Sequence, residues 1–165
     1  MRAAAEKNLS REFSLEDLRI RLGTRDGERC IVAEAALEAG ERLMMIDGEI
    51  SSTPCRYSVQ IGADMHIAPP AEIGADSGDA YLWRFLNHSC NPNTIIVRRV
   101  LIAIKPIAAG EEITFDYNTN EWAMAAPFKC RCGHCGGAEI RGYHYLTPAE
   151  KELRRHLLAD HLRSV

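Results

Sequence analysis

Three short segments of this chain carry most of the side chains that could support chemistry. They are residues 85–94 (FLNHSCNPNT), residues 110–118 (GEEITFDYN) and residues 130–135 (CRCGHC). The first combines amide, imidazole and thiol groups, the second ends in a tyrosine, and the third is dense in cysteine.

The cysteine segment has the spacing of a metal site. Cys130, Cys132 and Cys135 place three thiolates on one glycine-containing loop, and tetrahedral zinc takes four ligands. His134 is a poor fourth ligand because its neighbours would crowd the same face of the metal, so Cys90 is the remote candidate. Clustered free thiols and an iron–sulfur cluster with four cysteine ligands are the alternatives.

The two other segments are less specific when read alone. In residues 110–118, alternation along a strand puts Phe115 and Tyr117 on one face, but a tyrosine at a strand end is usually part of the core or its rim. In residues 85–94, a Cys90–His88 or Ser89–His88 nucleophile pair is not favoured, because near neighbours along the chain point apart and no Gly-x-Ser-x-Gly elbow is present. Spacing alone indicates a polar turn beside a metal ligand.

Composition limits the classes of protein that need be considered. A chain of 165 residues is long enough for one domain. Its net charge of −3 has both signs scattered along the sequence, so we expect no nucleic-acid-binding or membrane surface. No segment approaches the roughly 20 apolar residues that span a bilayer, and the first ten residues lack the apolar run of a signal peptide. We therefore predict an intracellular protein, in which six cysteines favour metal binding over disulfides.

Short strands and tight turns dominate the expected elements. Alternating apolar residues predict strands near residues 18–22, 57–61, 65–67, 95–97, 100–104 and 113–115. Asp47–Gly48 predicts a hairpin turn between residues 43–46 and 49–51. One helix is expected at the end of the chain: Thr147, Pro148 and Glu150 form a capping box, and four leucines at 153, 157, 158 and 162 fall on one face. The fold class is mainly β with a C-terminal helix.

Taken in order, RFLNHSCNPN, GEEITFDYN and CRCGHC resemble the SET domain and its post-SET zinc module, found in S-adenosylmethionine-dependent protein-lysine methyltransferases. The resemblance covers roughly residues 18–146. It implies a SET fold of short antiparallel strands, with the two polar segments threaded into a knot-like active site. It divides the chain into an N-terminal extension (1–17, loosely ordered), a SET domain (18–119), a post-SET zinc module (120–146) and a C-terminal helix (147–165).

The resemblance also assigns roles to individual residues. Tyr117 matches the catalytic tyrosine, and Tyr57 and Phe115 match the walls of a substrate lysine channel, where Phe115 implies room for two or three methyl groups. The residues implied to contact S-adenosylmethionine are Glu28, Arg29, Cys30, Arg84, Phe85, Asn87, His88 and, as an aromatic lid, Tyr143. The four implied ligands of a structural zinc ion are Cys90, Cys130, Cys132 and Cys135.

Two departures from the family pattern are visible. Arg29 stands where the family usually has the second glycine of Gly-x-Gly, and a lost glycine can close a pocket. The cysteine cluster is CxCx2C, where the family commonly shows CxCx4C. Its glycines allow the loop to compensate for the shorter gap.

The sequence thus predicts an enzyme that methylates lysine side chains of a protein, with di- or trimethylation expected from Phe115. The implied partner is a protein with an accessible lysine, such as a histone or another basic protein, in the cytoplasm or, in a eukaryote, the nucleus. The alternative is a catalytically inactive SET-fold module that binds a lysine-bearing peptide or protein. A redox sensor built on the cysteine cluster would leave Tyr117 and Asn87 unexplained.

Overall fold

The computed structural model describes residues 18–73 and 81–164. Short strands make up most of its regular structure, together with one α-helix near the C-terminus of these residues, so the expected mainly β class with a C-terminal helix is confirmed. The expected N-terminal extension, residues 1–17, lies outside the described residues. Within the described part, no helix is long and apolar enough to cross a membrane.

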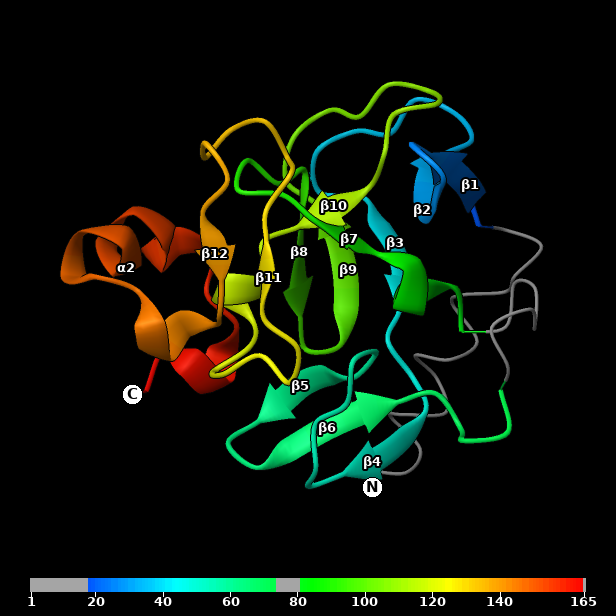
Figure 1. Cartoon of the computed structure of the whole chain (residues 1–165). Coiled ribbons are helices and arrows are strands. Elements are labelled where there is room, and N and C mark those ends of the chain that lie inside the picture. Colours follow the sequence, from blue (N-terminus) through cyan, green and yellow to red (C-terminus); the bar gives the residue numbers. More distant parts are fainter. Residues whose placement is uncertain (1–17, 74–80, 165) are drawn as a thin grey trace.

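The strands form small sheets rather than one large one (Figure 1). They are β1 (Ile20–Arg25), β2 (Glu28–Ala33), β3 (Arg42–Met45), β4 (Glu49–Ser51), β5 (Val59–Gly62), β6 (Met65–Ala68), β7 (Asn87–His88), β8 (Thr94–Val97), β9 (Val100–Ala103), β10 (Thr114–Phe115), β11 (Phe128–Lys129) and β12 (Glu139–Ile140). β1 pairs with β2, β11 with β12, and β7 with β10. The orders β3-β9-β8 and β4-β6-β5 describe the two three-stranded sheets.

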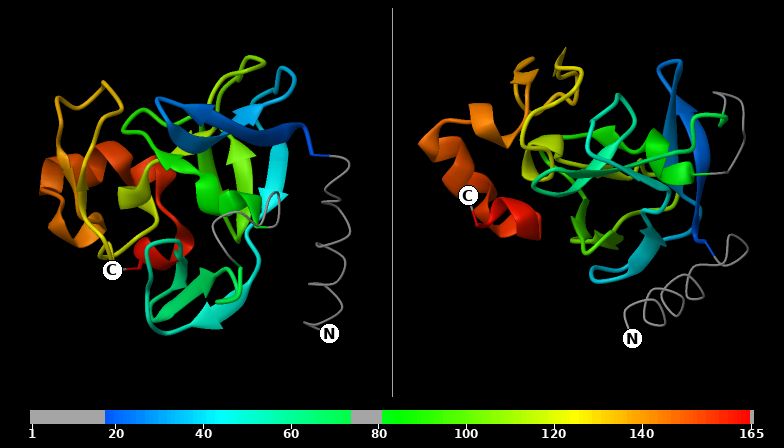
Figure 2. Two further views of the ribbon diagram at one scale, coloured as in Figure 1. Left: turned by 45° about the vertical axis from the view of Figure 1, so that its right-hand side comes forward. Right: turned by 90° about the horizontal axis from the view of Figure 1, so that it is seen from below.

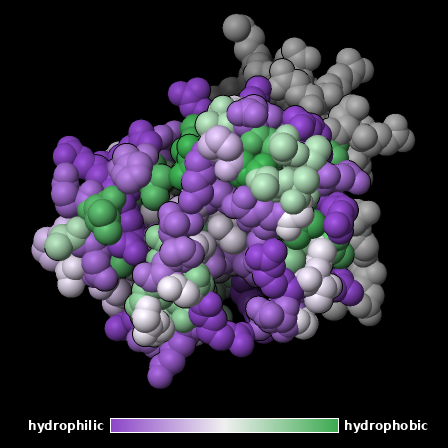
Figure 3. All heavy atoms as spheres, turned by 90° about the horizontal axis from the view of Figure 1, so that it is seen from above, coloured by the Kyte–Doolittle hydropathy of each residue, from purple (hydrophilic) through white to green (hydrophobic). Residues whose placement is uncertain are grey.

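One hydrophobic core joins these sheets. It contains buried aliphatic residues of β1, β2, β3, β5, β6, β8 and β9, and the side chains of Trp83, Leu86 and Phe115 close it near the short parallel pair β7–β10. Burial alternates along β8, because every second residue of a strand faces the same side, whereas three of the four residues of β9 are buried. The face seen from above in Figure 3 is mostly hydrophilic, with hydrophobic residues in separate groups.

The Asp47–Gly48 hairpin prediction is wrong. β3 pairs with β9 and β4 pairs with β6, so the residues that flank this dipeptide belong to different sheets. Gly48 has φ 148°, and a Cβ at this position would collide with the backbone oxygen of Ala68. The glycine therefore allows a close approach to the end of β6 where the chain enters the β4-β6-β5 sheet, and this requirement has the same sequence signal as a turn.

The C-terminal helix is shorter than predicted. α2 spans Pro148–Arg154 and begins with the expected capping box between Thr147 and Glu150. Leu158 and Ala159 then adopt extended backbone, because the Ala159 N–H donates to the Thr119 carbonyl at 2.9 Å instead of continuing a helix.

The four leucines consequently do not share one face. Leu158 and Leu162 are buried against Tyr143, whereas Leu153 is 71% exposed. The 3-10 turns Arg155–Leu157 and Asp160–Leu162 complete this region. It lies on the side of the β-core away from β1 and β2 (Figures 1 and 2).

Candidate active site

The parallel pair of β7 and β10 brings two of the three chemically suggestive segments side by side. Thr114 is opposite Asn87, and Phe115 is opposite His88. The Ser89 N–H extends the pairing by donating to the Phe115 carbonyl at 3.1 Å. The asparagine-rich segment therefore lies directly against the segment that contains Tyr117.

Part of the polar character of residues 85–94 serves this pairing rather than a pocket. Asn93 is 3% exposed, and its amide nitrogen donates to the Glu112 carbonyl at 2.8 Å while its oxygen accepts from the Thr114 N–H at 2.9 Å. Thr94 is fully buried and donates to the Thr114 carbonyl at 2.8 Å. Buried polar groups need such partners, so these side chains fix the register of the two segments.

Tyr117 is held rigidly at the end of β10. Its hydroxyl donates to the Leu86 carbonyl at 2.5 Å, and its backbone N–H donates to His88 Nδ1 at 3.1 Å. The ring centroid of Phe115 lies 4.7 Å from that of Tyr117. Burial, followed by the charges of Glu121 and Glu112, raises the pKa of Tyr117, so the phenol keeps its proton at neutral pH.

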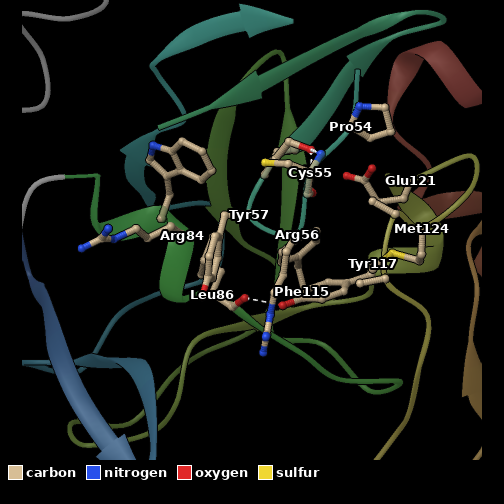
Figure 4. A pocket seen from close by; sticks show the side chains of 15 residues that line it. Pro54, Cys55, Arg56, Tyr57, Arg84, Leu86, Phe115, Tyr117, Glu121 and Met124 are labelled. Carbon is tan, nitrogen blue, oxygen red and sulfur yellow. Dashed lines mark hydrogen bonds between the residues drawn. The ribbon is translucent and has the colours of Figure 1, made fainter. Parts of the chain in front are cut away.

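A pocket opens beside this tyrosine (Figure 4) and holds about 500 Å³ of space, including its open mouth. Tyr57 and Phe115, the two predicted channel residues, both line it with Tyr117. The remaining lining residues come from residues 54–59, from the 3-10 helix Leu82–Phe85 and its successor Leu86, and from residues 121–126: Pro54, Cys55, Arg56, Ser58, Val59, Trp83, Arg84, Leu86, Glu121, Met124, Ala125 and Ala126.

His88 is an internal residue of the site. Its Nδ1 accepts from Tyr117, its Nε2 lies 3.2 Å from Cys90 Sγ, and the ring of Phe128 packs edge-on at 5.8 Å. Burial lowers the pKa of His88 to about 4, so the imidazole is neutral at physiological pH. Its side chain joins the tyrosine to the cysteine cluster.

A second group of predicted residues lies around Asn87. Its members are on β2 and on the 3-10 helix Leu82–Phe85. The Asn87 amide donates to the Arg29 carbonyl at 3.2 Å and to Glu112 Oε1 at 2.8 Å. The guanidinium groups of Arg29 and Arg84 lie 5.4 Å and 4.5 Å from the Phe85 ring centroid, within cation–π range.

The backbone at Arg29 is regular. Arg29 pairs with Thr24 across the β1–β2 hairpin, flanked by Glu28 opposite Arg25 and Cys30 opposite Gly23. Arg29 is not among the residues with a positive φ. The arginine therefore replaces a glycine without backbone strain, and its side chain extends toward Phe85. The Cys30 side chain is fully buried.

Tyr143 does not join this second group. It lies in the 3-10 helix Tyr143–Tyr145, is 9% exposed, and packs with Leu146, Leu158 and Leu162. The Lys151 ammonium covers its ring at 4.7 Å from the centroid. Its observed contacts are those of a core residue of the C-terminal region rather than of a lid.

The four predicted metal ligands do come together. The Sγ atoms of Cys90, Cys130, Cys132 and Cys135 all lie within 4.8 Å of one another, with 4.0 Å between Cys90 and Cys130 and 3.9 Å between Cys132 and Cys135. Zinc–sulfur bonds of about 2.3 Å place tetrahedral sulfur atoms about 3.8 Å apart, so this set could hold zinc. His134 contributes its backbone N–H to Cys132 Sγ at 3.5 Å.

Several residues of the site were not predicted from the sequence. Asp116 is 1% exposed and accepts from Arg154 Nε of α2 at 2.7 Å. Phe128 packs on both His88 and Tyr117. Glu121 is buried at the pocket. Only the position of Phe128 two residues before the cysteine cluster offered a signal, since a segment tied to Cys90 must pass close to His88.

Known proteins resemble this chain in sequence. The family model of the SET domain matches residues 28–118. A histone-lysine N-methyltransferase of Candida albicans, H3 lysine-36 specific, is 44% identical over 127 residues, covering 72% of this chain and 14% of the relative. The histone-lysine N-methyltransferase set9 of Schizosaccharomyces pombe is 32% identical over 127 residues, covering 72% of this chain and 28% of the relative. Methyltransferase flvH of Aspergillus flavus is 30% identical over 136 residues, covering 72% of this chain and 70% of the relative.

Two solved structures resemble the fold. KRYPTONITE, in complex with mCHG DNA and SAH, superposes with a TM-score of 0.56 at 23% identity, covering 75% of this chain and 29% of that one. The methyltransferase domain of human histone-lysine N-methyltransferase SETMAR superposes with a TM-score of 0.50 at 19% identity, covering 72% of this chain and 56% of that one.

Proposed function

The chain belongs to the SET-domain family, and we propose that it transfers methyl groups from S-adenosylmethionine to lysine side chains of a protein. One observation carries the proposal. The Tyr117 hydroxyl, fixed on the Leu86 carbonyl at 2.5 Å, borders a pocket that is also lined by Tyr57 and Phe115. A pocket with aromatic side chains on its wall and a fixed hydroxyl beside them suits the aliphatic stem and amine of lysine.

The residues around Asn87 fit the cofactor. They offer the Phe85 ring for a flat group and polar groups of Arg29 and Asn87 beside it. S-adenosylmethionine would supply an activated methyl group on a positively charged sulfur. The proposed cofactor residues are Glu28, Arg29, Cys30, Arg84, Phe85, Asn87 and His88, of which Cys30 and His88 would contribute backbone atoms because their side chains are buried. Tyr143 is left out of this set because it packs in the C-terminal core.

The chain's own residues would act by position and by excluding water. Lysine has a pKa of about 10.4 in water and must lose its proton before it can attack a methyl group. Burial in the pocket disfavours the ammonium form. Tyr117 and the Leu86 carbonyl would orient the amine, and positioning of this kind contributes up to about 7–11 kcal/mol in favourable systems.

The cysteine cluster would hold a structural zinc ion. Four cysteine ligands leave no open position for catalysis. Such an ion would tie Cys90, next to the site, to the segment that ends at Cys135, and so help to order the preceding residues 121–126, which contribute to the pocket wall.

A histone is the proposed substrate class, because the relatives at 44% and 32% identity are histone-lysine N-methyltransferases. Phe115 would leave room for two or three methyl groups. An intracellular, in a eukaryote nuclear, location and the absence of direct nucleic-acid and membrane binding remain predictions from the sequence.

One observation favours the alternative of an inactive binding module. The Arg29 side chain lies over Phe85, at 5.4 Å from the ring centroid, on the proposed cofactor side. If this side chain fills the cofactor site, the protein would bind a lysine-bearing peptide without transferring a methyl group.

Labelled methyl transfer to core histones tests the proposal. We expect incorporation into lysine, and Tyr117→Phe should lower the rate by about 100-fold or more, as loss of one fixed hydrogen-bond donor at a reacting centre does. Tyr145→Phe makes the same change at a 49% exposed tyrosine and should leave the rate unchanged. Mass spectrometry of the product should show two or three methyl groups on one lysine.

Undiminished transfer by Tyr117→Phe would remove the assigned role of this tyrosine. If the product lysine never carries more than one methyl group, the role assigned to Phe115 is refuted. No transfer at all would leave the binding module as the better account.

A further inference from the structure

Glu121 is a buried carboxylate that the proposed function does not yet use. It is 7% exposed and lines the same pocket as Tyr117. It sits one helical turn after the tyrosine, because its backbone N–H donates to the Tyr117 carbonyl at 2.8 Å. A buried carboxylate is costly without partners, so its contacts indicate what it does.

Its hydrogen bonds are asymmetric. The Gln60 N–H donates to Oε1 at 2.8 Å, and the Asn120 amide donates to the same oxygen at 3.1 Å. Within the part of the chain that the structure describes, no donor is assigned to Oε2. One oxygen thus anchors the side chain, while the other keeps its lone pairs available to accept a proton.

We propose that Glu121 accepts the proton that the substrate lysine must lose before methyl transfer. The inference rests on the proposed function, because it deepens the role of the same pocket. Its basis is the placement of a buried, anchored carboxylate on the wall of the pocket that would admit the lysine amine.

The chemistry balances without a further reactant beyond S-adenosylmethionine. An N–H bond of the lysine ammonium breaks, its electron pair stays on nitrogen, and the proton forms an O–H bond with Glu121. The nitrogen pair then bonds the methyl carbon while the carbon–sulfur bond breaks and its pair goes to sulfur, which becomes a neutral thioether. Glu121 releases its proton to water when the product leaves.

The surrounding charges are consistent with this role. Burial raises the pKa of Glu121 from 4.5 to about 7, and a proton acceptor works best with a pKa near the working pH. The other titratable or charged side chains on the pocket wall are those of Cys55, Arg56, Tyr57, Arg84 and Tyr117. In Figure 4 the Arg56 side chain reaches toward Leu86 and Tyr117, whereas Glu121 lies beside Pro54 and Cys55.

Two further titratable groups approach from neighbouring elements. His161 Nε2 lies 2.8 Å from the Asn120 carbonyl, and burial lowers the pKa of this histidine, so it brings no charge at neutral pH. The charge of Glu112 contributes to the raised pKa of Tyr117.

A purely structural role is the competing explanation, since the Glu121 carboxylate accepts hydrogen bonds from both Gln60 of β5 and Asn120. Glu121→Gln separates the two. Its amide oxygen still accepts from Gln60 and Asn120, so the fold is preserved, but it takes up no proton. Glu152→Gln makes the same change on an exposed surface and serves as the control.

Carbon-13 NMR gives the first test, independent of activity. In the zinc-loaded full chain with labelled glutamate side-chain carboxyls, the Glu121 signal, identified by its loss in Glu121→Gln, should titrate near pH 7. If that variant does not fold, the wild-type spectrum still tests the inference, because one glutamate signal must titrate near pH 7. Titration of every glutamate below pH 5.5 would overturn the inference.

The pH profile of kcat/KM on core histones gives the second test. At pH 7.5 Glu121→Gln should be about 100-fold slower than wild type, at the lower end of general-base effects, and the gap should narrow toward pH 10, where solvent can deprotonate lysine. The rise of the wild-type rate up to pH 7 should disappear in the variant.

The outcomes separate the two proposals. Equal pH profiles for wild type and Glu121→Gln overturn the role of Glu121 while methyl transfer stands. A variant slowed equally at every pH indicates a structural role and also overturns it. Absence of transfer by wild type at any pH refutes the proposed function, and the role of Glu121 with it.

Discussion

The β-core of residues 20–115 and the C-terminal region of residues 116–164 are stabilised by different interactions. The core rests on one large cluster of buried apolar side chains. The C-terminal region has a small cluster of Tyr143, Leu158 and Leu162. Much of the rest of its buried content is polar: Asp116, Asn118, Thr119, Asn120 and Glu121 are all less than 8% exposed.

The difference shows how one wall of the pocket is made. Burial of apolar area is spread over many contacts, so removing one weakens a core only in part. The C-terminal region instead depends on a few specific links: the cysteine cluster, the Arg154–Asp116 ion pair at 2.7 Å, and the Ala159–Thr119 hydrogen bond at 2.9 Å. Each of these links can be removed singly, and each removal should first destabilise the C-terminal region.

Metal removal should have the largest effect. Structural zinc contributes about 10–16 kcal/mol in small zinc domains, so a chelator should release residues 121–146 while the β-core stays folded. Hydrogen exchange measured by mass spectrometry should show lost protection at residues 128–140 and retained protection in β8 and β9.

Two cysteine variants provide the control for this experiment. Cys90→Ser should imitate the chelator, whereas Cys55→Ser changes an exposed thiol outside the cluster and should not. Uniform protection in chelator would contradict the idea that metal orders the C-terminal region.

The ion pair between α2 and the site should have the next largest effect. Arg154→Ala leaves the 1% exposed Asp116 carboxylate without its cation, and such a loss costs about 3–5 kcal/mol. Arg155→Ala, one residue later, removes a pair with Glu152 whose side chains are 77% and 74% exposed, and should change stability by less than about 1 kcal/mol.

Urea unfolding followed by circular dichroism measures both variants. Because an unpaired buried charge is the proposed cause, Asp116→Asn combined with Arg154→Ala should recover part of the loss. Equal stabilities of Arg154→Ala and Arg155→Ala would show that the buried ion pair contributes no more to stability than the exposed one.

A single apolar deletion in the core should have a somewhat smaller effect. Leu101 is fully buried on β9, and Leu→Ala at such a position costs about 2–5 kcal/mol. Leu153→Ala removes the same atoms from a 71% exposed residue and should be nearly neutral. In the same urea experiment, a Leu101→Ala protein that unfolds its C-terminal region first, with an intact core, would contradict the distinction between the two regions.

The sequence predicted individual strands and the meeting of the cysteines better than it predicted which strands pair. Alternating residues predicted strands where β5, β6, β8 and β9 lie because the period of two is a local property of each strand. Asp47–Gly48 was misread because a glycine needed for close approach to Ala68 has the same signature as a tight turn.

The C-terminal helix and Glu121 show what tertiary contacts add. Leucine spacing extended the helix too far because it carries no information about the Ala159–Thr119 bond. The surroundings of Glu121 depend on Gln60, 61 residues earlier in the chain, so no local pattern marks this carboxylate as buried. The sequence predicted that Arg29 could close a pocket, and its regular strand geometry shows that the arginine is accommodated without backbone strain.

Calorimetric titration of the zinc-loaded protein with S-adenosylmethionine and S-adenosylhomocysteine tests the central claim most directly. That claim is a working cofactor site around Asn87, next to the Tyr117 pocket. We predict saturable binding of both compounds and its loss in Asn87→Ala, which removes the amide that bonds Arg29 and Glu112. Absence of binding by the folded wild-type protein would contradict the account and favour the inactive binding module.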